Sequence, residues 1–146
     1  GTNVWSDVQF RVAIMVAPLV WGGVFLILRP TPNLLWFLTD FRQFLALVFI
    51  YPILEEIVFR GWLQGELYDW KKGKKSWQNI SVANVLCSII FASAHLFHHS
   101  VFWAMMTFFP SLVFGYFRDK YQSIYPSIVL HSFYNGGFVL LFVNSK

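Results

Sequence analysis

The segment Leu54-Glu55-Glu56-Ile57-Val58-Phe59-Arg60-Gly61 places three charged side chains within about two helical turns. The rest of the chain is apolar: 57% of its 146 residues are hydrophobic and only 12% are charged. Soluble domains carry about 25% charged residues, and a membrane-spanning helix needs about 20 largely apolar ones. The sequence therefore predicts an all-α polytopic transmembrane bundle, with this charged segment inside one of its helices.

Five membrane-spanning helices are expected, in a single domain that covers residues 1–146. Their predicted ranges are 8–28, 41–70, 80–97, 101–117 and 124–143. The second range is too long for one upright crossing, which indicates a tilted or partly interfacial helix. The polar residues discussed below confine the motif-bearing core to about 41–143.

Basic residues indicate how the chain is oriented in the membrane. The net charge is +4, and much of it comes from four lysines between the second and third spans. Positive residues accumulate in cytoplasmic connections. Here they fall on alternate sides of the predicted spans, namely Arg11, Lys71, Lys72, Lys74, Lys75, Arg118 and Lys120. We therefore predict a multi-pass protein of the cell membrane with a cytoplasmic N-terminus, whose partner is the lipid bilayer and not nucleic acid.

The two adjacent glutamates of the opening segment face different directions. Glu56 and Arg60 are four residues apart, with the acid N-terminal, which favours an ion pair on one helix face. Glu55 points about 100° away from Glu56. One carboxylate is then neutralised locally while Glu55 faces something else. The alternative is that these charges form only a structural salt bridge between helices.

Two further spans carry polar stripes. Residues three or four apart share one helix face. One stripe consists of Asn84, Ser88, Phe91 and His95, and the other of Ser127, His131 and Asn135. Such residues also act as hydrogen-bonding links between helices, each contributing about 0.6 kcal/mol. Links of this kind do not require polar stripes on three separate helices, so a functional site is the stronger hypothesis.

Counting residues predicts that one pair of these side chains lies at the same depth. Glu55 lies 15 residues before Trp70, and His95 lies 15 residues after Ile80. At about 1.5 Å per residue, both are roughly 22 Å from the lysine-rich loop between them. His131 is only seven residues into its predicted span, so the count pairs Glu55 with His95 and leaves His131 unplaced.

A carboxylate and a histidine in a secluded pocket can activate water, because desolvation makes the carboxylate a better base. A second pair, His131 and Asn135, could donate hydrogen bonds to the oxyanion of a tetrahedral intermediate. Together these four residues predict hydrolysis of a peptide bond inside the membrane.

Other functions compete with this interpretation. Glu55, His95 and His131 could instead bind zinc as a two-histidine, one-carboxylate site. His95 also has helix-face spacing with His98 and His99, although these two lie at the end of the span. A non-proteolytic transporter, or an immunity or scaffold protein, could use the same residues as a proton relay. No G-x-S-x-G elbow is present, and Cys87 lies in an apolar run that indicates packing.

The three motifs together resemble a known family. Glu55, Glu56 and Arg60 form E-E-x-x-x-R, Phe91 and His95 form F-x-x-x-H, and His131 and Asn135 form H-x-x-x-N. In this order they are similar to the motifs of the CAAX protease and bacteriocin-processing family, the glutamic-type intramembrane proteases. The resemblance implies that Glu55 and His95 activate water, that His131 and Asn135 form the oxyanion hole, and that Glu56, Arg60 and Phe91 support them.

The resemblance also bears on cofactor and substrate. We expect no metal and no cofactor, although the family was once viewed as metalloproteases and zinc stays a mechanistic alternative. The resemblance implies a membrane-associated protein or peptide as substrate. The length of the chain favours a small prokaryotic member that processes a leader or a C-terminal sorting tail, because few flanking helices leave little room for a prenyl group. Gly61 and Gly65 form a G-x-x-x-G, which predicts close approach of another helix of the same chain.

Overall fold

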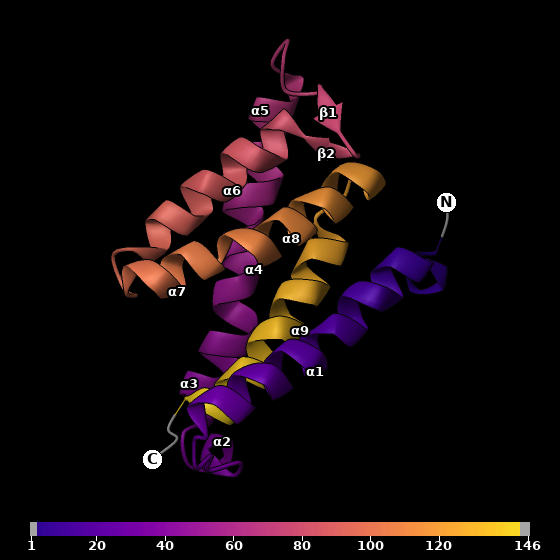
Figure 1. Ribbon diagram of the computed structural model, residues 1–146. Coiled ribbons are helices and arrows are strands. Elements are labelled where there is room, and N and C mark those ends of the chain that lie inside the picture. The colour runs from indigo at the N-terminus through magenta and orange to yellow at the C-terminus, as the bar shows by residue number, and fades with distance from the viewer. Residues whose placement is uncertain (1–2, 144–146) are drawn as a thin grey trace. The chain divides into compact units, whose positions relative to one another are not determined.

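The computed structural model describes residues 3–143, which divide into two compact units. Unit 1 contains residues 3–53 and 129–143, and unit 2 contains residues 54–128. Figure 1 labels their helices and strands. The single-domain organisation over 1–146 stays a prediction.

Unit 1 is helical in its described residues. Its first long helix, α1 (Val8–Leu28), has the predicted bounds. Asp7 begins this helix by accepting a hydrogen bond from the Gln9 N–H at 2.9 Å. Arg29 ends it in the left-handed conformation, followed by Pro30. The remaining elements are η1 (Val4–Ser6), α2 (Trp36–Thr39), α3 (Phe41–Leu45), η2 (Ala46–Ile50) and most of α9 (Tyr125–Phe142).

Helix α9 is fixed within unit 1 by contacts to other segments of that unit. The contacts reach three segments. The Tyr134 hydroxyl donates to the Ala13 carbonyl of α1 at 2.7 Å. Val139 of α9 packs with Val48 of η2 and with Trp36 of α2 in a small apolar core. These contacts are between residues far apart in the sequence, so they determine which face of α9 the unit buries.

Residues 41–69, predicted as part of one span, are helical throughout but not uniformly α-helical. After α3 and η2 come α4 (Tyr51–Glu56), η3 (Ile57–Leu63) and α5 (Gln64–Asp69). The segments η2 and η3 are π-helical, with hydrogen bonds from residue i+5 to residue i. Glu55 and Glu56 therefore lie on a short α-helical segment between two widened turns, which the sequence did not indicate.

Unit 2 also contains the third and fourth predicted spans, whereas most of the fifth, as α9, lies in unit 1. The third is α6 (Val82–His95), which begins at the N-cap Ser81. The fourth is divided into α7 (Val101–Met106) and α8 (Phe108–Tyr121). The division at Thr107 has a physical cause, because Pro110 lacks the N–H that would bond to the carbonyl of the preceding turn. A short hairpin of β1 (Ser76–Trp77) and β2 (Ile80–Ser81) precedes α6 and was not predicted.

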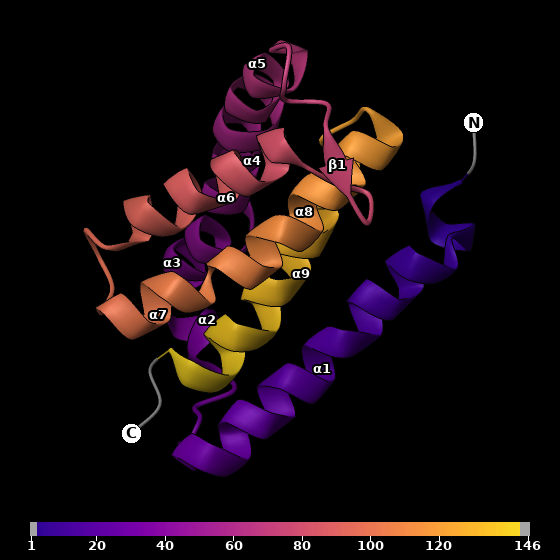
Figure 2. The same cartoon turned by 45° about the horizontal axis from the view of Figure 1, so that its top comes forward.

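Helices α6 and α8 run side by side in both Figure 1 and Figure 2. They approach closely at Gly115 of α8. A Cβ atom at this position would overlap the Asn84 side-chain oxygen and lie 2.8 Å from Gln64 Oε1. Both amides are buried, so neither has room to move away. At Gly65 an added Cβ would lie 3.2 Å from Arg118 Nη2, the end of a side chain, and at Gly61 its nearest neighbours would be 3.8 Å away. Close approach of a helix at the G-x-x-x-G therefore stays a prediction.

Gly115→Ala is expected to destabilise the protein by about 1–3 kcal/mol, because the added methyl group overpacks a filled site. The measurement is the midpoint of thermal unfolding of the purified chain in detergent, followed by circular dichroism. Gly22→Ala is the matched control, since an added Cβ there meets nothing within 4 Å. Equal midpoints for both variants would contradict this packing.

The distribution of polar and apolar side chains is that of a membrane protein. Large apolar side chains such as Leu19, Leu26 and Ile27 are exposed on α1, whereas charged Glu56 and Arg60 are fully buried. Among the described residues, Val8–Leu28 and Val101–Tyr121 are long and apolar enough to cross a bilayer, and Val82–His95 is a shorter apolar helix. The all-α membrane class is thus confirmed, while the count of five crossings stays a prediction.

Candidate active site

The ion pair predicted for the second span is present and fully buried. Arg60 Nε lies 3.3 Å from Glu56 Oε2, and both side chains are 0% exposed. The guanidinium also lies between two aromatic rings, 4.7 Å from the centroid of Phe91 and 5.5 Å from that of Phe114. Cation–π contacts of this kind strengthen when water is excluded. Arg60 thus links the first motif to Phe91 of the second motif.

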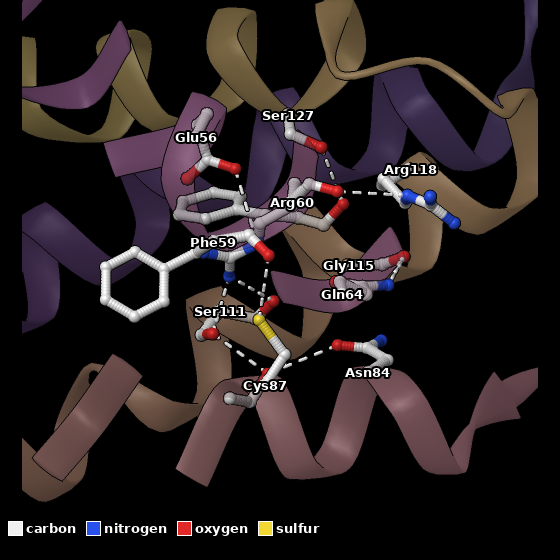
Figure 3. Close-up of polar contacts among 12 residues, drawn as sticks. Glu56, Phe59, Arg60, Gln64, Asn84, Cys87, Ser111, Gly115, Arg118 and Ser127 are labelled. Carbon is white, nitrogen blue, oxygen red and sulfur yellow. Dashed lines mark hydrogen bonds and ion pairs between the residues drawn. The ribbon is translucent and has the colours of Figure 1, made fainter. Parts of the chain in front are cut away.

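A chain of polar side chains continues from Arg60 through unit 2 (Figure 3). Arg60 Nη2 donates to the Ser111 carbonyl at 2.8 Å and to the Ser111 hydroxyl at 2.5 Å. The Ser111 hydroxyl donates to Ser88 at 2.8 Å, and Ser88 donates to Asn84 Oδ1 at 3.1 Å. The Asn84 amide N–H donates to the Leu112 carbonyl at 2.9 Å. The predicted stripe on α6 therefore faces α8 and the buried arginine.

A second polar cluster lies on the side of unit 2 near the lysine-rich loop. Gln64 Nε2 donates to the Gly115 carbonyl and to Asp119 Oδ1, both at 3.0 Å. Asp119 also accepts from the Ser81 hydroxyl and pairs with Arg118 at 3.0 Å. Sequence reasoning missed Gln64, Ser111 and Asp119. The position of Gln64 between the two glycines of the G-x-x-x-G was the sequence signal that could have indicated it.

The π-helical segment offers its carbonyl groups to other helices. Phe59 O accepts from the Cys87 thiol at 3.1 Å, and Arg60 O accepts from Arg118 Nε at 3.2 Å. A π-helical turn shifts backbone hydrogen bonds away from the usual i to i+4 pattern. Cys87 is buried, so the predicted packing role is met, together with this hydrogen bond.

His95 is held in a defined orientation at the end of α6. Its Nδ1 lies 2.8 Å from the Phe91 carbonyl, and its ring lies 4.5 Å from the Phe91 ring. A carbonyl oxygen only accepts, so Nδ1 carries the proton and donates. In the neutral imidazole Nε2 is then the acceptor nitrogen. This is the arrangement that a histidine requires to accept a hydrogen bond from water.

Glu55 is half-buried and lies in the electrostatic neighbourhood of the histidine cluster. Partial desolvation and the imidazoles of His95 and His98 lower the pKa of His99, while the Glu55 carboxylate acts in the opposite direction. The ring of His99 stacks on that of His95 at 5.8 Å. Glu55 and His95 therefore both act electrostatically on His99, while their equal depth stays a prediction.

The residues of the third polar stripe make separate contacts in the fold. His131 is 5% exposed on α9 within unit 1. Asn135 Nδ2 donates to the Leu47 carbonyl of the π-helical segment η2 at 3.1 Å. One of the two amide N–H groups of Asn135 is thus used within the fold. Ser127, the third member of the predicted stripe, belongs to unit 2, where its hydroxyl donates to the Phe114 carbonyl at 2.8 Å.

Potential metal ligands do not cluster in the part of the chain that the structure describes. Within residues 3–143, no three His, Cys, Asp or Glu side chains gather as a metal-binding group. This finding includes the predicted alternative site of three histidines, His95, His98 and His99, which do not form such a group.

Comparison with protein families gives a match. The family model of the type II CAAX prenyl endopeptidase Rce1-like proteins matches residues 37–137. The matched range includes all three motifs, from Glu55 to Asn135. None of the curated proteins and none of the solved structures matches the chain. Because the match covers more than half of the sequence, the chain belongs to the Rce1-like family and is, at the level of that family, a CAAX-type intramembrane protease.

Proposed function

We propose that the protein is a glutamic-type intramembrane endopeptidase. In the proposed reaction Glu55 accepts a proton from a water molecule, and His95 Nε2 orients that water toward the scissile carbonyl. His131 and Asn135 donate hydrogen bonds to the oxyanion that forms on that carbonyl. Water adds to the carbonyl carbon, and the proton held by Glu55 then passes to the leaving amine.

The observation that carries this proposal is the hydrogen bond from His95 Nδ1 to the Phe91 carbonyl. It leaves Nε2 as the acceptor nitrogen in the neutral imidazole. The buried Glu56–Arg60 pair supports the assignment of Glu55 as the base, since Glu56 is already paired with a cation. Glu56, Arg60 and Phe91 are then supporting residues, as the motif pattern implied.

The substrate class follows from the family and from the membrane. We propose a membrane-associated protein or peptide, cleaved in the cell membrane, with the N-terminus and the lysine-rich loop on the cytoplasmic side. Within unit 2 this orientation is supported by Lys74 and Arg118, which both lie over the Tyr68 ring, at 5.5 and 5.4 Å, so the two basic connections meet at one end.

In cells whose wild-type protein is replaced by the His95→Ala variant, the membrane-protein substrate is expected to accumulate in its unprocessed form. Removing the imidazole takes away the group that orients the water, and general acid–base groups contribute about 10²- to 10⁴-fold to rate. The measurement is quantitative mass spectrometry of membrane proteins, with labelling of new chain ends. Leu96→Ala, at an exposed neighbouring position, is the control.

Peptide substrates test the same proposal in purified form. A peptide ending in a CAAX sequence, supplied with and without a farnesyl group, distinguishes a prenylated from an unprenylated substrate. Normal processing by the His95→Ala variant, in cells and with the purified substrate, would exclude the proposed mechanism.

A further inference from the structure

The outward face of α6 and the lysine-rich hairpin form a surface that the proposed peptidase reaction does not use. A cavity of about 380 Å³ lies there, lined by Lys75, Trp77, Ile80, Val82, Val85 and Leu86. All of these residues belong to unit 2. Lys75 is the charged group among them, and the α6 residues are aliphatic. The cavity is therefore apolar along the helix and cationic at the hairpin.

The hairpin holds its lysine in a defined place. The strands β1 and β2 pair Ser76 with Ser81 and Trp77 with Ile80. The Val82 N–H at the start of α6 donates to the Lys75 carbonyl at 2.8 Å. Gln78 and Asn79 form the turn between the strands, both with positive φ, as a tight hairpin turn requires. Lys75 thus lies at the first turn of α6, and not on a long unstructured connection.

The N-terminus of α6 itself does not supply the positive end of this site. Its first N–H groups are used within the fold: Val82 donates to Lys75 O, Ala83 to Gly73 O at 3.2 Å, and Asn84 to the Ser81 hydroxyl at 3.0 Å. An anion near the hairpin would therefore be bound by lysine side chains. Lys71, Lys72, Lys74 and Lys75 are all exposed.

The apolar part of the surface continues along one face of α6. Val82, Val85 and Ile89 recur at spacings of three and four, and Ala92 follows three residues later, so they share that face. Ile89 and Ala92 line a second cavity, of about 360 Å³, toward the other end of the helix. From Val82 to Ala92 is ten residues, or about 15 Å, which is half of the roughly 30 Å hydrocarbon thickness of a bilayer. The strip therefore has the length of one leaflet.

We propose that this surface binds an anionic phospholipid, with the phosphate at Lys75 and an acyl chain along Val82, Val85 and Ile89. Trp77 is 75% exposed beside the cavity, which suits an indole at the boundary between headgroups and acyl chains. A lysine cluster next to a spanning helix favours acidic headgroups electrostatically. A zwitterionic lipid would satisfy the apolar strip but not the cationic end.

The test is native mass spectrometry of the full chain in detergent with equal amounts of phosphatidylglycerol and phosphatidylcholine. The wild-type protein is expected to retain phosphatidylglycerol preferentially. Lys75→Gln is expected to lower the affinity for phosphatidylglycerol about fivefold, the effect of one lysine close to an anionic lipid. Lys71→Gln removes the same charge from the same loop but lies outside the cavity lining, so its effect should be clearly smaller.

A second variant tests the contribution of the apolar strip to lipid binding separately from that of the lysine charge. Val85→Trp fills the strip and leaves every lysine in place, so it should also lower retention of phosphatidylglycerol. Circular dichroism establishes that the variants keep their helical content. Equal retention of both lipids, equal effects of Lys75→Gln and Lys71→Gln, or unchanged binding by Val85→Trp would each overturn the proposed site.

Discussion

Glu55→Gln is expected to lower the rate of peptide hydrolysis by about 10²- to 10⁴-fold, the contribution of a general base. Glutamine has nearly the same shape as glutamate, but its amide does not accept a proton at neutral pH. The buried Glu56–Arg60 pair is untouched by this change, so the variant should fold and insert normally. The measurement is kcat/KM on the substrate identified in cells, with binding measured separately.

Glu66→Gln provides the matched control for this variant. It makes the same chemical change on the following helix α5, where Glu66 is exposed. Its kcat/KM should equal that of the wild-type protein. If Glu55→Gln retained activity within a factor of about three, another group would have to be the base, and the assignment of different roles to the adjacent glutamates would be wrong.

Arg60→Met is expected to destabilise unit 2 by about 3–5 kcal/mol, because it removes the countercharge of a buried carboxylate. Arg60 is fully buried, contacts Phe91 and Phe114, and donates to Ser111 of α8. Methionine retains much of the volume of arginine but none of its hydrogen bonds. The measurement is the unfolding midpoint of the purified chain in detergent, with helical content followed by circular dichroism.

The double variant Glu56→Gln with Arg60→Met shows where the loss arises. Replacing both charges of a buried pair is often far less costly than removing one of them. The double variant should therefore recover a large part of the stability lost in Arg60→Met. Arg42→Met, at an exposed position, should change stability by no more than about 0.5 kcal/mol. An Arg60→Met protein as stable as Arg42→Met would falsify the structural role of the pair.

Several features could be predicted from sequence because they depend on local spacing. The bounds of α1 follow from an apolar run between Asp7 and Pro30. The Glu56–Arg60 pair follows from a separation of four residues on one helix. The polar stripe from Asn84 to His95 follows from helical periodicity, and its buried members do face another helix. Each of these requires only the geometry of a single helix.

Other features were not accessible in this way because they depend on two helices at once. The π-helical segments around Glu55 and Glu56 expose carbonyl groups that Cys87, Arg118 and Asn135 bind from other segments. For this reason Asn135, which was predicted as an oxyanion donor, uses one of its amide N–H groups to bind the Leu47 carbonyl. Periodicity alone does not show which backbone carbonyls a neighbouring helix can reach.

The sequence by itself determined that this protein is a helical membrane protein and which residues carry its three motifs, since composition and residue spacing are properties of the chain. The tertiary structure decided which partners those residues meet. It placed Arg60 between two rings and against Ser111, required glycine at position 115, and fixed the proton of His95 on Nδ1. Burial makes the contacts of Arg60 obligatory, because a buried charged group has no water to replace a missing partner.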